Sequence, residues 1–281
     1  MDAQRGWFDA SVVSDEIPVS AEATIAYARA TNDANPCHLS GEVASPLFAV
    51  VPALKTLVLP KKAATSLHSL HGEHDLVIHR PIVPGMILRT RARLVGVHPS
   101  PAGVVMVGRG ETRTVEGQLV NEQYLTWVFR GETLTAPIGD RAPDHRLPAG
   151  IRETTPLARV VAPLDADQTR RYAEASGDRD AYTYDDAYAR SLGYPGAIVH
   201  GLCTMAFAGR AIVDRCCGGN SRRLARLAVR FSGLLLMRSG QRLTTTIWAA
   251  GHRDGRQALA FESVDVDGQT VVTHGLAEVH P

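Results

Sequence analysis

The chain contains 281 residues, of which 44% are hydrophobic and 21% are charged, and its formal net charge at pH 7 is +1. These values are typical of a soluble globular protein with enough residues for two ordinary domains. So small a charge gives no electrostatic basis for binding nucleic acid or an anionic membrane, and neither is expected as a partner. The N-terminal residues include acids and no apolar segment, which argues against a signal peptide, and no apolar run is long enough to span a bilayer.

In chain order, the first part of the sequence predicts helices and then strands. A short amphipathic helix is expected over residues 24–33, and an apolar helix over 45–59. Alternating polar and apolar residues then predict strands at 73–79, 86–98, 103–115 and 118–130. The segment 132–163 is rich in proline and has little periodicity, so it is predicted to be a linker.

The same order returns after the linker. Helices are expected at 169–178 and 200–217, and strands at 223–231, 241–252, 258–266 and 270–280. TIAYARATND in the first half aligns with TRRYAEASGD in the second, and GQLVNEQYLTWV aligns with GQTVVTHGLAEV at nearly the same offset, which indicates a duplication. We therefore expect two α+β units, residues 1–131 and 164–281, each an antiparallel sheet with its helix on one face. The two sheets are expected to pair edge to edge.

Each half carries a short polar motif before its apolar helix. The first half has DANPCH, in which an Asp precedes a His by five residues, and the second has YAEASGD and GAIVHGLCTMAF. These phrases resemble those of the MaoC-like, hydratase-2 family of R-specific enoyl-thioester hydratases and dehydratases. The resemblance covers nearly the whole chain and implies a tandem double hotdog fold, in which each sheet wraps a long central helix. It also implies addition or removal of water on acyl thioesters of coenzyme A or an acyl carrier protein.

The resemblance can be carried over residue by residue. Asp33 and His38 match the family's catalytic Asp and His, and Asn35 stands between them as the pattern requires. In the second half Asp178 matches the catalytic Asp, whereas Thr183 replaces the His. The intact dyad therefore lies in the first half, although in two-half relatives the working site usually lies in the second. Two other positions of the second-half motif also depart from the family pattern: Asp180 replaces Asn and Ala181 replaces Pro.

The family also has a His-Gly-Leu motif at the start of its central helix, and here the second half keeps the motif while the first half lacks it. The second half keeps it as His200-Gly201-Leu202, whereas the first half has Pro46-Leu47-Phe48 there. The peptide N–H of Gly201 could stabilise a developing enolate oxygen, or the glycine could serve only to allow close backbone approach. His200 is expected to be a structural hydrogen-bonding residue more than a proton carrier.

The chemistry favours the first-half dyad. Hydration needs a group that exchanges protons near neutral pH, which His38 can do while the Asp33 carboxylate orients it. The alternative to a catalytic role is that Asp33 is only a turn residue at the end of a helix and that His38 is only a surface histidine. The hydroxyl of Thr183 does not ionise near pH 7 and could at most position a water or a substrate group. Asp178 and Asp180 are either a carboxylate pair with one raised pKa or a relic that caps a turn.

The remaining candidates belong to the lining of the substrate site or to the protein core. We assign five residues to substrate binding: Asn35, Asp180, Tyr182, Thr183 and His200. Cys203 is expected in the core, and the four cysteines, without CxxC spacing, predict reduced thiols in a cytoplasmic protein. His68, His71 and His74 are interpreted as structural, so no metal and no other cofactor is expected. Five basic residues could receive phosphates of coenzyme A or of a carrier-protein arm, or simply cover a soluble surface: Lys61, Lys62, Arg222, Arg223 and Arg226.

Three functions remain open on the sequence. The leading one is an enoyl-thioester hydratase or 3-hydroxyacyl-thioester dehydratase in polyketide or fatty-acid-type metabolism. The second is a lyase, isomerase or cyclase whose altered second-half site adds a substrate hydroxyl within a polyketide-like thioester. The third is a subunit that binds an acyl thioester or a partner without catalysis. All three share the fold, which does not define the reaction, and a homodimer is compatible with each.

Overall fold

The computed structural model of the protein describes residues 11–57 and 69–281. Within them the protein is α+β, with all its strand pairs antiparallel in a single sheet. The first half contributes β1 (Ser11–Val13), β2 (Ile17–Pro18), β3 (Ser69–Ile78), β4 (Ile87–Ser100), β5 (Gly103–Thr114), β6 (Leu119–Arg130) and β7 (Ile138–Gly139). The second contributes β8 (Ala158–Pro163), β9 (Leu224–Phe231), β10 (Arg242–Arg253), β11 (Arg256–Val264) and β12 (Thr270–Val279).

The two halves join into this sheet through one pair of strands. The strand order is β1-β4-β5-β6-β3-β9-β12-β11-β10-β8, and β2 and β7 also pair with β4. At the centre β3 pairs with β9, from Glu73 opposite Arg230 to Val77 opposite Arg226. This pairing satisfies the backbone groups that each half would expose alone, so the expected edge-to-edge association is confirmed.

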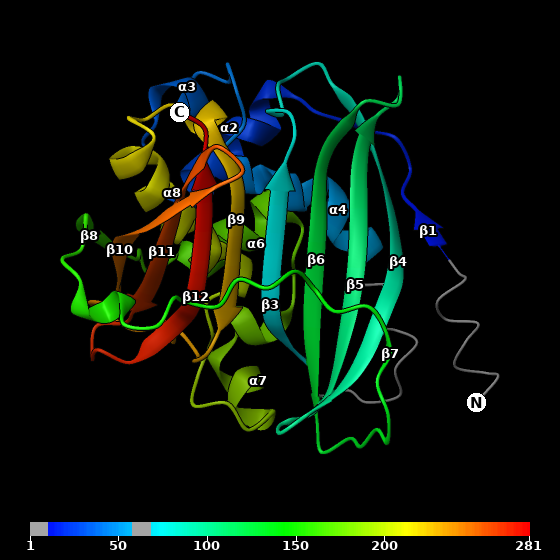
Figure 1. Ribbon diagram of the computed structural model, residues 1–281, viewed down its shortest axis with the longest axis vertical. Coiled ribbons are helices and arrows are strands. Elements are labelled where there is room, and N and C mark those ends of the chain that lie inside the picture. Colours follow the sequence, from blue (N-terminus) through cyan, green and yellow to red (C-terminus); the bar gives the residue numbers. More distant parts are fainter. Residues whose placement is uncertain (1–10, 58–68) are drawn as a thin grey trace.

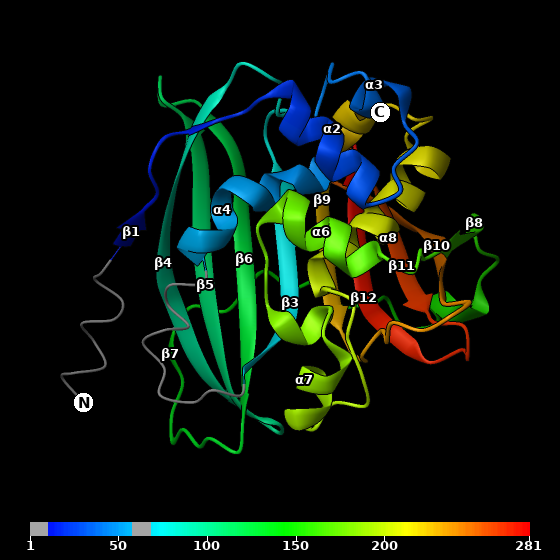
Figure 2. The same ribbon diagram turned by 180° about the vertical axis from the view of Figure 1, so that it is seen from behind.

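The helices cover one face of the sheet, as Figures 1 and 2 show from the two sides. The first half has α2 (Ala21–Ala30), α3 (Pro36–Leu39), η1 (Pro46–Ala49) and α4 (Val50–Leu57). The second half has α6 (Gln168–Ser176), η3 (Ala181–Thr183), α7 (Asp186–Ser191), α8 (Gly201–Cys216) and η4 (Ser221–Arg223), and η2 (Ile151–Glu153) lies in the connection between the halves. Across the opposite face runs the segment from β7 to β8 (Figure 1).

The second-half helix α8 lies in the middle of the core. It is apolar around most of its circumference, and Cys203, Met205 and Ile212 have no exposed surface, as the apolar sequence predicts for a helix buried on all sides. Gly209 allows α8 to approach both halves closely. A Cβ there would lie 2.9 Å from the side chain of Leu227 and 3.0 Å from that of Leu47.

The predicted linker contains two strands. β7 pairs with β4, and Ala158–Pro163 forms β8, which pairs with β10 along its length. β8 is an edge strand, and an edge position tolerates the proline that made this segment resemble a loop. The end of the predicted linker is therefore a strand of the sheet, although the sequence indicated no strand in that segment. The division into two units otherwise remains a prediction.

The connection between the halves is fastened to the outer face of the sheet by His145. Its Nδ1 lies 2.6 Å from the carbonyl oxygen of His274, and its Nε2 lies 3.8 Å from the carboxylate of Glu73. Burial alone would lower the pKa of His145, but the hydrogen bonds to Glu73 and His274 and the charge of Glu73 raise it.

This raised pKa predicts a pH-dependent contribution to stability. Because the pKa of His145 is higher in the folded than in the unfolded protein, protonated His145 stabilises the fold. This stabilisation is fully present at pH values below the ordinary pKa of 6.5, and it is lost as the pH rises through the folded-state pKa. We expect His145→Asn to lower the free energy of unfolding by roughly 1 kcal/mol at acidic pH and by less at alkaline pH. Urea unfolding of both proteins at about pH 6 and about pH 9 checks this, and an equal difference at the two values would contradict it.

Candidate active site

The motif after α2 forms a short turn that brings Asp33 and His38 together. Asn32 adopts a left-handed conformation (φ 52°), which redirects the chain after the helix. Asn35 then caps α3, because its side-chain oxygen accepts a hydrogen bond from the Cys37 N–H at 3.0 Å. The backbone N–H of Asn35 donates a hydrogen bond to Asp33 Oδ1 at 3.0 Å. Pro36 occupies the first helical position, where its missing N–H costs nothing.

Asp33 and His38 form a buried hydrogen-bonded dyad. Asp33 Oδ2 lies 2.7 Å from His38 Nδ1, and the two residues are only 4% and 1% exposed. Burial alone would raise the pKa of Asp33, but hydrogen bonds from His38, from the Asn35 N–H and from Ser45 hold it below the ordinary value. Asp33 is therefore ionised at neutral pH and accepts the Nδ1 proton, which leaves Nε2 of His38 to face the second half of the chain.

The second half of the chain completes this site. Ser221, in η4, places its Oγ 2.8 Å from His38 Nε2, and Asn35 Nδ2 donates to the carbonyl oxygen of Gly219 at 2.7 Å. Arg210 of α8 hydrogen-bonds to the carbonyl oxygen of Asn32. The dyad loop is thus fixed by residues roughly 180 positions away in the chain, which sets the position of His38 relative to both halves.

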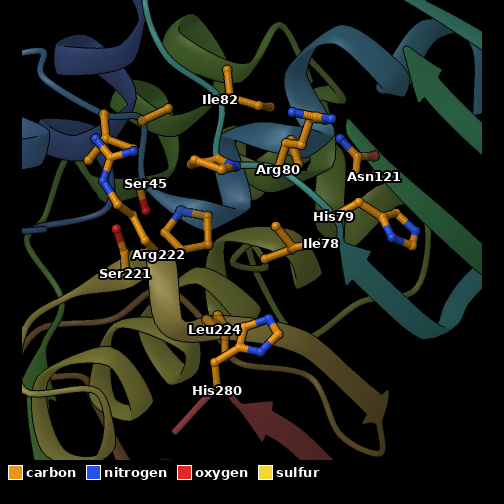
Figure 3. A pocket seen from close by; sticks show the side chains of 15 residues that line it. Ser45, Ile78, His79, Arg80, Ile82, Asn121, Ser221, Arg222, Leu224 and His280 are labelled. Atoms are coloured by element: carbon orange, nitrogen blue, oxygen red, sulfur yellow. The ribbon is translucent and has the colours of Figure 1, made fainter. Parts of the chain in front are cut away.

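A cleft between the halves leads to the dyad. Figure 3 shows it with Ser45 and Ser221 at one end and His79 and Asn121 at the other. Ser221 is hydrogen-bonded to His38, and Ser45 is close enough to Asp33 to help lower its pKa, so this first end lies next to the dyad. Arg80 and Arg222 also line the cleft and give it positive charge.

Replacement of Asn35 separates its two roles. Asn35→Asp keeps the oxygen that caps α3 but loses the donor to Gly219, whereas Asn35→Ala loses both. We expect Asn35→Ala to cost about 1 kcal/mol of stability through the cap. Both variants should lower turnover by about tenfold, because both release the loop that positions His38. Thermal unfolding and steady-state kinetics of the two variants check this. Full turnover in Asn35→Asp would show that the contact between the halves does not position the dyad.

The corresponding motif of the second half has no proton-transferring histidine. Thr183 is buried, and its hydroxyl donates to the carbonyl oxygen of Asp180 at 2.6 Å, closing a single turn of 3₁₀ helix. Asp180 itself is exposed, and Asp178 is partly buried. His200 Nε2 lies 3.0 Å from the carbonyl oxygen of Asp178. Burial lowers the pKa of His200 to about 4, so the ring is neutral at physiological pH and the hydrogen bond is structural.

A separate cavity surrounds Gly201 at the start of α8. Tyr182, His200 and Thr204 line it together with Phe231, whose ring would lie 3.2 Å from a Cβ on Gly201. This cavity and the cleft share no lining residue. The cleft borders Ile78 and Leu224, which end β3 and begin β9, whereas the cavity borders the other ends of these paired strands.

The predicted catalytic residues, which the sequence divides between the two halves, are distributed in the same way in the structure. The four residues predicted to be catalytic do not form one site: Asp33 and His38 lie at the cleft, whereas Gly201 lies at the cavity and Asp178 beside it. The duplication explains the difference, because each half carries its own copy of the motif to opposite ends of the shared strand pair. Of the residues predicted to bind substrate, only Asn35 belongs to the dyad loop.

The predicted cationic residues have different environments. Arg222 lines the cleft, but Arg226 is buried in an ion pair with Asp75, and Arg223 donates to the carbonyl oxygen of His280. His71 and His74 lie in β3 with their rings 5.4 Å apart, while Lys61, Lys62 and His68 lie outside the described residues. In residues 11–57 and 69–281 no three potential ligands are grouped for a metal ion, and no helix there has the length and apolarity to cross a bilayer.

Sequence reasoning missed Ser45, Arg80 and Ser221. Each lies outside the two motifs, and Ser221 reaches His38 only because the halves pack against each other. No local signal in the sequence locates Ser221. It begins η4, which leads into β9, and β9 pairs with β3 of the first half.

Comparisons with known proteins agree with this architecture. Residues 149–270 match the family described as MaoC like domain. The chain is 32% identical over 205 residues to 3-hydroxyacyl-thioester dehydratase Y of Mycobacterium tuberculosis, covering 71% of this chain and 67% of that protein. It is 27% identical over 207 residues to an enoyl-CoA hydratase of the same organism, covering 74% and 68%.

Solved structures show the same fold. A MaoC-like dehydratase from Phytophthora capsici superimposes with a TM-score of 0.85 at 23% identity, covering 99% of this chain and 98% of that one. The tandem double hotdog expected from the sequence is therefore confirmed. The family match covers mainly the second half, which lacks the histidine, so it does not decide which half carries the chemistry.

Proposed function

The chain belongs to the MaoC-like dehydratase family, and on that premise we propose that its proton-transfer site is the Asp33–His38 dyad of the first half. The protein is an acyl-thioester hydratase or dehydratase, a hydro-lyase that relates 2-enoyl and 3-hydroxyacyl thioesters. The observation that supports the placement is the fixed imidazole. Asp33 holds Nδ1, and Nε2 is directed at the Ser221 hydroxyl, which borders the cleft.

The dyad can move a proton in both directions. In hydration, a proton passes from water to His38 Nε2 by way of the Ser221 hydroxyl, which lies between the imidazole and the cleft, as the water oxygen adds to the β-carbon. The imidazolium then returns a proton to the α-carbon by the same route. The ionised Asp33 stabilises this imidazolium while it exists. In dehydration the same steps run in reverse. Acid–base catalysis of this kind contributes about 10²–10⁴-fold to the rate.

The developing enolate oxygen needs a hydrogen-bond donor, and the helix start that could supply one differs between the two halves. Pro46 begins the helical segment of the first half as Gly201 begins α8, but a proline has no peptide N–H. We propose that the first turn of the helix beginning at Pro46, which borders the cleft, stabilises the oxygen through the N–H groups that follow the proline. Arg80 and Arg222 then receive the phosphates of coenzyme A or of a carrier-protein arm.

Other features of the proposed function follow from composition. The low net charge supports a partner that is a small acyl thioester instead of a nucleic acid or a membrane, and the four free thiols support a cytoplasmic location. A homodimer is part of the same proposal, and analytical ultracentrifugation would test it.

Turnover with mass detection tests the reaction and the carrier together. The wild-type protein is given 2-enoyl and 3-hydroxyacyl thioesters of several chain lengths, each attached either to coenzyme A or to a carrier protein. The proposal predicts products that have gained or lost the mass of water. A product of unchanged mass would favour an isomerisation or an intramolecular addition, and tight binding without turnover would favour a non-catalytic subunit.

A further inference from the structure

Ser221 extends the dyad into a relay of three residues. The Asp33 carboxylate lies 2.7 Å from one nitrogen of His38, and the Ser221 hydroxyl lies 2.8 Å from the other. All three residues are at least nine-tenths buried. A carboxylate, an imidazole and a hydroxyl joined in this order activate serine nucleophiles on several unrelated folds, where they are recognised by geometry and not by sequence.

The direction of the hydrogen bonds follows from the groups present. The Asp33 carboxylate can only accept, so His38 donates from Nδ1, and its Nε2 is left as an acceptor. The Ser221 O–H is therefore the donor to Nε2, which is the orientation required for its deprotonation. Ser221 lines the cleft and His38 does not (Figure 3), so a ligand that enters meets the serine hydroxyl before the imidazole.

The Thr183 hydroxyl of the second half is also buried, but its hydrogen bonding differs from that of Ser221. The Thr183 hydroxyl donates to the carbonyl oxygen of Asp180, and the Nε2 of His200 is engaged with the carbonyl oxygen of Asp178. No imidazole lone pair is directed at Thr183 there. The relay is thus specific to the first-half site, where Ser221 of the second half supplies the hydroxyl.

We propose that Ser221 is a nucleophile and that this site hydrolyses acyl thioesters as a second activity. Ser221 Oγ attacks the thioester carbonyl while His38 Nε2 takes its proton, and the C–S bond breaks as the thiolate leaves with that proton. This gives an acyl-serine ester and a free thiol. Water, deprotonated by His38, then attacks the ester, and Ser221 recovers its proton as the carboxylic acid is released.

The surroundings of Ser221 suit the charge that develops in these steps. The helical segment after Ser45 borders the same cleft through Pro46 and Ala49; its Phe48 N–H is used by the carbonyl oxygen of Ser45, but the positive end of the segment still favours a developing negative charge. Arg80 and Arg222 add positive charge along the cleft. The chemical class of substrate is an acyl thioester with or without a double bond, because attack at the carbonyl does not involve the α- and β-carbons.

Saturated thioesters separate this activity from hydration, because they have no double bond to hydrate. Wild-type protein is incubated with butanoyl-CoA and octanoyl-CoA, and free thiol is measured with a chromogenic disulfide. We expect thiol release, and an acyl group on the peptide that contains Ser221 after an acid quench. Ser221→Ala and His38→Ala should each lower the release by at least about 100-fold. Ser191→Ala, at the exposed end of α7, is the matched serine control and should leave release unchanged.

Two further measurements keep the proposal falsifiable. Ser221→Cys retains a nucleophile and should still form an acylated protein even if Ser221→Ala fails to fold. Hydration of an enoyl-CoA by the same wild-type preparation distinguishes a failure of this proposal from a failure of the proposed function. The proposal is overturned if wild-type protein releases no thiol from saturated thioesters, or if Ser221→Ala releases it as fast as wild type.

Discussion

His38→Ala is expected to lower kcat for hydration of a 2-enoyl thioester by about 10²–10⁴-fold, the contribution of a positioned general acid and base. We propose this role for His38 because Asp33 fixes its Nδ1 proton, and its Nε2 is directed at Ser221, which lines the cleft. The substitution should have little effect on KM, because the imidazole acts on the reacting atoms and not on the carrier. Steady-state kinetics that follow loss of the conjugated double bond measure both constants.

Thr183→Ala is the matched control for this prediction. Thr183 occupies the corresponding position of the second-half motif, but its hydroxyl is used within its own turn. We expect Thr183→Ala to change kcat by less than about tenfold, since it removes no proton-transferring group. A large loss in Thr183→Ala together with normal turnover in His38→Ala would move the chemistry to the second half.

Asp75→Asn is expected to cause a large loss of stability, about 3 kcal/mol or more, because it breaks a buried ion pair where the halves join. Arg226 of β9 donates to both carboxylate oxygens of Asp75 in β3, at 2.9 and 2.6 Å, and the Asp75 side chain is 2% exposed. Burial alone would lower the pKa of Arg226, but the hydrogen bonds that it donates to Asp75 and the charges of Asp75 and Glu278 raise it. Without the Asp75 charge, Arg226 keeps only Glu278, at 3.3 Å.

Urea unfolding of wild type and Asp75→Asn measures this loss, and Glu16→Gln provides the control. Glu16 pairs with Arg89 at 2.6 Å, but both side chains are about half exposed, so solvent screens the interaction. The Glu16 variant should therefore unfold close to wild type. If the two variants lost the same stability, the ion pair between β3 and β9 would not be what joins the halves.

Much of the fold could be predicted because the duplication repeats its signals. Strands β4 to β6 and β9 to β12 follow clear alternation of polar and apolar residues, and their predicted ranges differ from the observed ones by two residues or fewer at each end. The apolar segment that becomes α8 is long enough to be distinguished from a buried strand. β8 was missed because it ends in a proline within a proline-rich segment that resembles a loop, and because an edge strand needs little alternation of its own.

The site could be predicted only where its residues are close in sequence. Asp33, Asn35 and His38 lie within one turn, so their spacing alone indicates that they meet. Ser221 contacts His38 across the packed halves, and no local pattern reports such a contact. For the same reason the sequence placed Gly201 and the dyad in different halves but did not show how far apart they lie, since that distance depends on how the halves are arranged.

The two halves have kept complementary parts of one ancestral site. The first keeps the proton-transferring pair but has Pro46 at its helix start, and the second keeps Gly201 but has Thr183 in place of histidine. The structure shows that these parts do not combine, because the cleft and the cavity lie at opposite ends of the strand pair. Any reaction at the cleft must therefore rely on the dyad and on residues added from the second half, Ser221 among them.

The most direct test of the central claim is a comparison of Asp33→Asn with Asp178→Asn, the same substitution at the two equivalent positions. Hydration of a 2-enoyl thioester is measured for both under identical conditions. The account predicts that Asp33→Asn loses at least about 100-fold in kcat, because the amide no longer fixes the His38 tautomer, while Asp178→Asn stays within about tenfold of wild type. An active Asp33→Asn and an inactive Asp178→Asn would contradict it and place the reaction in the second half.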